Sequence, residues 1–542
     1  MDATQFKVTG TKAVIFSQKL DAIQSRRCNM TLLNNLEVLV TADEGYRAFE
    51  KAVVAAKTRI DMGFRVFDPR MHLLSCEARE FGPRWVDLLL AKLNEGVDIT
   101  IALSDFDPVV RPELHRGSFK SLSILLGIAE MVTGHGRLRV TVEDHPARVG
   151  WAPRIALWPK VQSQVAQTCD WLNGLEDAAR AEAIRFMPRF TQFTFEKDGK
   201  IHPKRREFPP MLPVTHHQKL AVIDDEVLYV GGLDLDARRM DTVHHALPAE
   251  KTWHDVHVIL QDKKRALSAR EHLESFSAEC AGEVSIRSPE GLLRTLSVKR
   301  KRNSGSLSPH VCDTGIMDRH LELIEQAERL IYLESQFLRD PVIADALVAR
   351  AKTAPDLGLI ILLPAAPLEV AFEGAEGLDY KFGEYLQAKA IGRITEAFGS
   401  RAFIASPAHC RKSEAGDRAT LCGAPMIFVH SKVSIFDDHA GLVTSANLNG
   451  RSMRWDTELG IEISDPDQVR MLRKRVMGAW LPKGADDCFC AAAPETVKKW
   501  RELAQQNASR APADRSGFLL PHTASAAESF GTLLPGIPVE MV

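Results

Sequence analysis

Two stretches of the chain carry the same chemically useful residues at the same spacing. Residues 216–234 read HHQKLAVIDDEVLYVGGLD, and residues 429–447 read VHSKVSIFDDHAGLVTSAN. Each contains a histidine, a lysine two residues later and an aspartate five residues after the lysine, and equivalent positions are 213 residues apart. One such match arises by chance at roughly one position in ten thousand, but two with similar flanks indicate an internal duplication.

Both copies predict the same local arrangement. The residues concerned are His217, Lys219 and Asp224 in the first copy and His430, Lys432 and Asp437 in the second. The histidine and lysine stand two residues apart at the start of an apolar run, so on a strand their side chains share one face. Small residues downstream, including Gly232 and Ser445, let the backbone approach whatever these side chains bind.

Two imidazoles facing one substrate suit a two-step displacement at phosphorus. A neutral histidine attacks and forms a phosphohistidine, while a protonated one donates to the leaving oxygen and later takes a proton from water or an alcohol. Lys219, Lys432 and Asn447 would neutralise charge on the phosphoryl oxygens. This chemistry needs no metal and the sequence shows no metal-binding cluster, so we expect neither a metal nor another cofactor.

Some of these residues have a purely structural alternative. A histidine beside a lysine is often a satisfied core residue next to a solvated cation, but the duplication disfavours that interpretation. An aspartate that ends a strand before a turn usually caps the turn, so Asp224 and Asp437 are open to either role, with capping favoured. His216 is expected to be a wall residue, and His254 and His257 strand residues near the site.

Strand and helix patterns alternate on both sides of the duplication. Strands are predicted at 36–40, 59–69 and 97–104 and helices at 43–57 and 85–96, followed in the second half by helix, strand, helix and strand at 318–328, 329–337, 342–352 and 357–364. This alternation predicts an α/β protein with a largely parallel sheet covered on both faces.

The first half carries an insertion. Arg65 and Gln336 occupy matching positions, but 152 residues separate the first from His217 and 94 separate the second from His430. The extra 58 or so residues are placed within 144–212, where they are positioned to wall or cap a site. Trp151, Trp158 and Trp171 in this segment are expected to be core residues, with acyl-chain contact as the alternative. The basic residues 204–206 predict a solvated loop, with headgroup or membrane-surface contact as the alternative.

Composition narrows the class of protein. A hydrophobic content of 45% and a charged content of 26% are ordinary for a soluble globular chain, and the net charge of −2 argues against broad nucleic-acid binding. Nine scattered cysteines without a CxxC pair predict reduced thiols. The sequence shows no Sec signal and no apolar run that would span a membrane. We therefore expect a cytoplasmic monomer with peripheral membrane contact, or export without a Sec signal.

The paired motif resembles the signature of the phospholipase D superfamily, over most of residues 36–480. The strings GGLDL (231–235), RRMDT (238–242), WHDV (253–256), IYLESQF (331–337) and SANLNGRSM (445–453) are similar to eukaryotic-type phospholipases D rather than to the short nucleases of the superfamily. The resemblance implies two similar α/β/α sandwich halves related by pseudo-two-fold symmetry, with one active site at their interface. It also implies His217 as the nucleophile and His430 as the general acid/base.

The same resemblance implies supporting residues. Each histidine should have an orienting carboxylate, and we assign Asp255 to His217 and Glu458 to His430. Ser445, Asn447, Gly232 and Gln336 are assigned to phosphate binding or orientation. Asp234 stands where many members have Asn and is expected to be structural, and Thr444 replaces the usual Gly.

The predicted function is hydrolysis of glycerophospholipids at a membrane surface to phosphatidic acid and a headgroup alcohol, with transfer of the phosphatidyl group to primary alcohols. The alternatives are a cardiolipin-synthase-like phosphatidyltransferase, a nuclease or other phosphodiesterase on the same scaffold, and a non-catalytic lipid-binding protein. The expected domains are an extension (1–35), a first half (36–296), a basic linker (297–309), a second half (310–485) and a C-terminal tail (486–542) that is partly disordered from about 505 onward. The linker is expected to be exposed, with contact to an anionic surface as the alternative.

Overall fold

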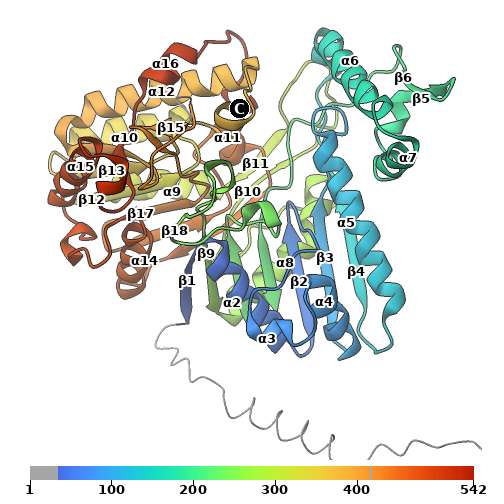
Figure 1. Ribbon diagram of the computed structural model, residues 1–542, viewed down its shortest axis with the longest axis horizontal. Coiled ribbons are helices and arrows are strands. Elements are labelled where there is room, and N and C mark those ends of the chain that lie inside the picture. The colour runs from blue at the N-terminus through green and yellow to red at the C-terminus, as the bar shows by residue number, and fades with distance from the viewer. Residues whose placement is uncertain (1–34, 415–417) are drawn as a thin grey trace, which may run out of the picture.

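Two mixed β-sheets covered by helices form the body of the protein (Figure 1). The computed structural model describes residues 35–414 and 418–542. The predicted extension at 1–35 lies almost wholly outside the described residues. The predicted α/β class with two similar halves is confirmed, since both halves carry strands and helices in the same order.

The first sheet has seven strands in the order β1-β9-β8-β7-β2-β3-β4. Their bounds are Leu36–Val40 (β1), Arg59–Phe64 (β2), Asp98–Ser104 (β3), Leu138–Glu143 (β4), Leu220–Ile223 (β7), Val227–Gly231 (β8) and Val256–Gln261 (β9). The helices are α2 (Thr41–Ala55), α3 (Cys76–Arg79), α4 (Trp85–Asn94), α5 (Pro112–Met131) and α8 (Lys263–Cys280).

The second sheet has nine strands in the order β11-β10-β19-β18-β17-β12-β13-β14-β20. The bounds are Leu293–Val298 (β10), His310–Thr314 (β11), Leu330–Ser335 (β12), Gly358–Leu362 (β13), Ala402–Pro407 (β14), Lys432–Phe436 (β17), Ala440–Thr444 (β18), Glu458–Ile463 (β19) and Leu519–Pro521 (β20). The helices are α9 (Gly315–Gln326), α10 (Pro341–Thr353), α11 (Leu368–Phe372), α12 (Leu378–Phe398), α13 (Gly450–Arg454), α14 (Pro466–Gly478), α15 (Glu495–Ala508) and α16 (Ser525–Phe530). A separate two-stranded ribbon joins β15 (Thr420–Leu421) to β16 (Ala424–Pro425).

The duplication is visible in the strand order. The run β9-β8-β7-β2-β3-β4 in the first sheet corresponds to β19-β18-β17-β12-β13-β14 in the second. Only β2-β3-β4 and β12-β13-β14 pair in parallel, so the predicted largely parallel sheet is wrong. Each motif strand returns through a tight turn to an antiparallel neighbour, because the three connecting residues, 224–226 and 437–439, are too few for a parallel crossover.

One hydrophobic cluster is shared by the two halves. Along β7, Leu220 and Val222 belong to this cluster, while Ala221 and Ile223 face the helices on the other side of the sheet. This alternation is the two-residue period of a strand buried on both faces. The shared cluster also contains Val433 and other residues of the second sheet. The halves are therefore packed into one core.

The boundary between the halves differs from the prediction. Strand β10, which begins within the predicted first half, pairs antiparallel with β19 and β11 and so belongs to the second sheet. Only residues 299–309 form the connecting loop. The basic residues 299–302 indicated a linker, but the strand before them is part of the sheet, where Thr295 and Leu296 are fully buried.

The C-terminal segment is structured, contrary to the predicted partly disordered tail. Val497, Trp500 and Ala504 are spaced three and four residues apart, so they form one buried face of α15. Strand β20 pairs antiparallel with β14, and Leu519 and Leu520 are fully buried. The Ala- and Ser-rich composition concealed this regular spacing of apolar residues.

The insertion forms a substructure of its own, at the upper right of Figure 1. It contains α6 (Trp151–Asn173), α7 (Asp177–Arg185) and the hairpin β5 (Thr194–Lys197)–β6 (Lys200–Pro203), packed around a separate small hydrophobic cluster. The prediction that its tryptophans are core residues is wrong, since Trp151 and Trp171 are 59% and 42% exposed and Trp158 is half-buried. Among the described residues, no helix is both long and apolar enough to cross a bilayer.

Candidate active site

The two motif histidines lie at the interface between the halves. The backbone N–H of His217 donates to the carbonyl of Thr457 at 2.8 Å, and the N–H of His430 donates to the carbonyl of His254 at 2.7 Å. Each histidine therefore precedes a central strand of its own sheet while its backbone is hydrogen-bonded to the other half. These reciprocal contacts bring both motifs to one place, as the sequence predicted.

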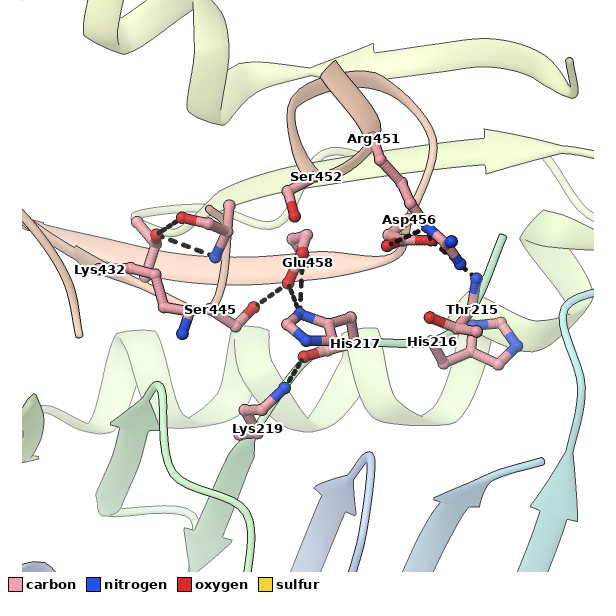
Figure 2. A network of polar contacts seen from close by, with 12 residues as sticks. Thr215, His216, His217, Lys219, Lys432, Ser445, Arg451, Ser452, Asp456 and Glu458 are labelled. Atoms are coloured by element: carbon pink, nitrogen blue, oxygen red, sulfur yellow. Dashed lines mark hydrogen bonds and ion pairs between the residues drawn. The ribbon is translucent and has the colours of Figure 1, made fainter. Parts of the chain in front are cut away.

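Each histidine is held by a carboxylate from the opposite half. Nδ1 of His217 lies 3.0 Å from both carboxylate oxygens of Glu458, and Figure 2 shows this pair. Nδ1 of His430 lies 2.6 Å from Oδ2 of Asp255. The predicted assignment, Asp255 to His217 and Glu458 to His430, is wrong. The backbone contacts explain the exchange: His217 is bonded to the residue before Glu458, and His430 to the residue before Asp255.

The crossed pairs determine which ring nitrogen is available for chemistry. A carboxylate accepts, so Nδ1 of each ring donates to it and Nε2 is left for a substrate. Burial raises the pKa of Glu458 to about 8 and that of Asp255 to about 6. Burial, with Lys219 next, lowers the pKa of His217, and burial, with Lys432 next, lowers that of His430. Without a bound anion, both imidazoles are favoured in the neutral form.

The two lysines are buried against the histidines. Nζ of Lys219 donates to the carbonyl of His217 at 2.5 Å and lies 3.9 Å from Oδ2 of Asp234. Nζ of Lys432 donates to the carbonyl of His430 and lies 2.9 Å from Nδ1 of that ring. Burial lowers the pKa of Lys432 to about 7. Two ammonium groups with few carboxylate contacts form a site that favours an incoming anion.

Two arginines that the sequence analysis did not assign to the site strengthen this positive charge. The guanidinium of Arg239 lies 3.6 Å from the ring centre of Trp253, and that ring is 4.6 Å from the ring of His430. Arg65 follows β2. After burial and the nearest lysine, an arginine is the next largest cause that lowers the pKa of each histidine. Arg65 acts on His217, and Arg239 acts on His430. Nε of each arginine is buried without a hydrogen-bond partner.

A buried chain of polar side chains supports His430 from behind. Asp241 contacts Nδ1 of His245 at 2.7 Å, His245 contacts His254 at 3.3 Å, and Nε2 of His254 lies 3.2 Å from Glu334. Glu334 belongs to β12 of the second half and also accepts from Ser431, the residue after His430. The chain therefore joins the halves immediately beside the second motif.

Comparison with known proteins agrees with this geometry. Residues 320–480, which contain the second motif and Glu458, match the family model described as "Cardiolipin synthase, PLD-like domain". This match agrees with the duplicated motif and with the histidine–carboxylate contacts across the interface. The chain belongs to the phospholipase D superfamily.

Individual relatives are distant. Phospholipase D1 of Schizosaccharomyces pombe is 25% identical over 46% of this chain and 25% of its own length. A cardiolipin synthase of Listeria monocytogenes is 23% identical over 52% of each chain. The protein thus spans about a quarter to a half of these relatives. The solved phosphatidylserine synthase of Haemophilus influenzae Rd KW20 is 14% identical, with a TM-score of 0.41 over 82% of this chain and 86% of its own.

The remaining predicted residues fall into different places. Ser445 donates to Oε2 of Glu458 at 2.5 Å, so it orients the carboxylate and not a phosphate. A Cβ on Gly232 would lie 2.1 Å from Oδ1 of Asp255, which explains the glycine. The amide oxygen of Asn447 is buried without a partner, which leaves it available to a ligand. Among the described residues, no recorded contact links Gln336 to either histidine.

Asp234 and His216 have structural roles, as expected. Oδ1 of Asp234 accepts from the N–H of Val66 at 3.0 Å, which ties the turn after β8 to the segment after β2. Nδ1 of His216 contacts the hydroxyl of Thr457 at 2.9 Å, and burial lowers the pKa of His216 to about 4. His216 is therefore a neutral wall residue. Across 35–414 and 418–542, no group of three or more His, Cys, Asp or Glu side chains is arranged to hold a metal ion.

The aspartates of the phospholipase D motif lie outside the site. Asp224 accepts backbone N–H groups of Lys57, Thr58 and Arg59 at 2.7–3.0 Å. Asp437 accepts those of residues 328–330 at 2.7–2.9 Å. Each aspartate follows its histidine by seven residues, with β7 or β17 between them. At roughly 3.3 Å per residue this places the aspartate about 20 Å from the histidine. Their inclusion among the catalytic residues is wrong and their role is structural, but each aspartate accepts from the segment that enters β2 or β12 and does not cap its own turn.

The contacts of Asp437 generate a stability prediction. Asp437→Ala removes the acceptor of three backbone N–H groups and should lower the free energy of unfolding by on the order of 2–3 kcal/mol in urea titrations. Asp487→Ala is the matched control, because Asp487 is 77% exposed and contacts only an exposed lysine, and it should leave stability nearly unchanged. If Asp437→Ala keeps its stability but loses catalysis, Asp437 has a catalytic role and not a structural one.

Proposed function

We propose that this protein is a phospholipase D that cleaves the distal phosphodiester bond of glycerophospholipids. The observation that carries the proposal is the pair of crossed histidine–carboxylate contacts, which leave two Nε2 atoms beside four buried cations. Such a site fits one phosphoryl group, because the histidines supply a nucleophile and an acid while the cations neutralise the oxygens.

The reaction has two steps. In the first, Nε2 of His217 attacks phosphorus, the bond to the headgroup oxygen breaks, and His430 gives its proton to that oxygen. In the second, water or a primary alcohol attacks, His430 takes its proton, and the bond between phosphorus and His217 breaks. Glu458 stabilises the positive charge that His217 gains on attack, and Asp255 does so for protonated His430.

Substrate binding supplies the missing proton on His430. In the free site burial and Lys432 hold the pKa of His430 low, so the ring is neutral. A bound phosphodiester adds a negative charge beside it, which raises the pKa and favours the imidazolium. Burial, followed by Lys219 and Arg65, lowers the pKa of His217 and keeps the nucleophile neutral. Because similar causes act on His430, the assignment of the nucleophile to His217 rests on the resemblance to the family.

The lipid substrate is supported by the names of the relatives, a phospholipase D and cardiolipin synthases. A cardiolipin-synthase-like phosphatidyltransferase is the second candidate, favoured by the family model that matches residues 320–480. It would use the same histidines and differ in the acceptor, which would be a phosphatidylglycerol hydroxyl and not water. A nuclease on this scaffold is the third candidate.

The central test is incubation with mixed phospholipids and a primary alcohol. We expect phosphatidic acid and the phosphatidyl alcohol, and a loss of about 10²–10⁴-fold or more in His217→Ala and in His430→Ala. His439→Ala is the matched control, since His439 is 43% exposed on the turn after β17 and should retain activity. Cardiolipin as the main product would favour the transferase, and cleavage of DNA alone would overturn the proposal.

The crossed carboxylates generate a second kinetic prediction. With a p-nitrophenyl phosphodiester, whose leaving group needs no acid, Asp255→Asn should still form the phosphoenzyme but release it slowly, giving a burst of p-nitrophenol. Glu458→Gln should abolish the burst, because Glu458 supports the nucleophile. Phosphoenzyme mapping should then find the label on His217. A burst in Glu458→Gln and none in Asp255→Asn would exchange the roles of the histidines.

The buried lysine of the second motif generates a pH prediction. Because the pKa of Lys432 is lowered to about 7, the group is charged below this pH and neutral above it. Loss of the Lys432 charge should therefore make the kcat/KM of the free enzyme decline as pH rises through about 7, while ionisation of Glu458, whose pKa is raised to about 8, acts in the opposite direction. Lys432→Arg keeps its charge throughout and should move this decline to higher pH, even if its activity is lower. A decline at the same pH in both proteins would assign it to another group.

A further inference from the structure

Helix α6 of the insertion presents large apolar side chains to solvent. Trp151 and Ile155, four residues apart on one face, are 59% and 51% exposed. Trp158 continues this stripe and stacks on Phe208 at 5.2 Å between ring centres, and Phe208 is itself 45% exposed. Farther along the helix, Val161 and Val165 lie close to the same face and fill the insertion's own core. The insertion's core therefore covers the later turns of this apolar side and leaves the first two turns of α6 exposed, which indicates a partner.

Positive charges surround this stripe. Between residues 151 and 169 the only charged side chains are Arg154 and Lys160. The loop before Phe208 adds Lys204, Arg205 and Arg206, with Glu207 as its one acid. The guanidinium of Arg154 donates to the carbonyl of Phe208 at 2.5 Å, which joins the loop to the helix. The cations are thus concentrated on one face of a chain whose net charge is only −2.

The loop between the halves adds four more cations. Its carbonyls at Ser304 and Ser306 accept the N–H groups of Ala152 and Gly150, and Asn303 donates to the carbonyl of Arg148. The loop therefore runs against the start of α6. The preceding residues 299–302, Lys-Arg-Lys-Arg, are all exposed. The sequence allowed two interpretations of residues 204–206 and of the basic linker, namely an exposed loop or a contact with an anionic surface. Both segments meet at α6.

We propose that Trp151, Ile155, Trp158 and Phe208, with the basic residues 204–206 and 299–302, form a docking face for an anionic phospholipid bilayer. Indole and aliphatic side chains partition into the headgroup boundary, and lysine and arginine around them attract anionic headgroups. The combination of an apolar centre with a basic rim favours a bilayer over a nucleic acid, which would need the cations and not the aliphatic side chain.

The docking face is connected to the catalytic motif. Phe208 precedes His217 by nine residues, and the chain between them is anchored by Met211, whose carbonyl accepts from Val149, and by Leu212, whose N–H donates to Asp107. His217 precedes β7, which runs antiparallel to β2, so it lies at the carboxyl ends of the parallel strands from which the insertion also emerges. This inference rests on the proposed lipid substrate. Docking through this face brings the edge of the sheet that carries His217 to the bilayer.

Vesicle sedimentation tests the docking face without reliance on turnover. The full chain carrying His217→Ala, which keeps the lipids intact, is mixed with phosphatidylcholine vesicles with or without phosphatidylserine. We expect binding to the anionic vesicles, and about a tenfold or greater loss when Trp151→Ser and Ile155→Ser are combined, or when residues 299–302 are changed to Gln. Leu126→Ser and Lys498→Gln are matched controls, being 53% and 76% exposed elsewhere, and should bind normally.

Several outcomes would overturn the proposal. One is absence of binding to anionic vesicles by the parent protein. Another is binding that the apolar changes leave intact and that single-stranded DNA displaces, which would assign the face to a nucleic acid. A third is self-association that the same changes abolish, which would assign it to a second copy. Circular dichroism confirms that each variant is folded.

Activity measurements separate this proposal from the proposed function. In the otherwise unchanged enzyme, the docking variants should cleave a short-chain, monomeric phospholipid normally and lose about tenfold or more on anionic vesicles. If the protein binds anionic vesicles through this face but forms no phosphatidic acid, the docking face stands and the proposed reaction fails. Equal losses on monomeric and vesicle substrates would show that the changes damage the site and would refute docking.

Discussion

The structure depends on an exchange of carboxylates between the two halves. Glu458 of the second half holds His217 of the first, and Asp255 of the first holds His430 of the second. Either half alone would bury a carboxylate without its imidazole and present an imidazole without its carboxylate, and a buried ionisable group without a partner is costly. The reactive tautomers of both histidines therefore exist only when the halves are joined.

The remainder of the interface is built to hold that exchange in place. Backbone hydrogen bonds link each histidine segment to the strand that carries the opposite carboxylate, and the shared hydrophobic cluster packs one face of each sheet into a common core. The buried chain from Asp241 through His254 to Glu334 adds a polar link. Strand β20 extends the edge of the second sheet, and helix α15 packs its apolar face into the shared cluster. Rigid elements on both sides limit movement of the rings, as catalytic groups require.

Concentrating cations in a buried site has a cost that an anionic substrate relieves. Lys219, Lys432, Arg65 and Arg239 repel one another at close range, and burial lowers the pKa of each. Asp234, Asp255 and Glu458 offset part of this repulsion. In the proposed reaction a bound phosphodiester would offset more of it, and the charge that develops during phosphoryl transfer more still. Charges that are already in position would then stabilise the proposed transition state.

The sequence by itself determined the elements and the residue types of the site. A period of two along 217–223 and 430–436 predicted that histidine and lysine share a strand face, and the constant offset of 213 predicted two like halves. It also favoured a structural role for Asp224 and Asp437 over a catalytic one, but their partners at 57–59 and 328–330 lie far away in the chain and not in the adjacent turn.

Only the tertiary structure decided which carboxylate serves which histidine, where the halves divide, and which arginines join the site. Asp255 and Glu458 are equivalent under the duplication, so spacing cannot tell a contact within one half from a contact across the interface. Arg65 and Arg239 follow different strands and meet the histidines only because β2 and β7 are neighbours and the turn after β8 folds back over them. Local patterns record the period of a strand, whereas the position of one sheet against another depends on packing between residues far apart in the chain.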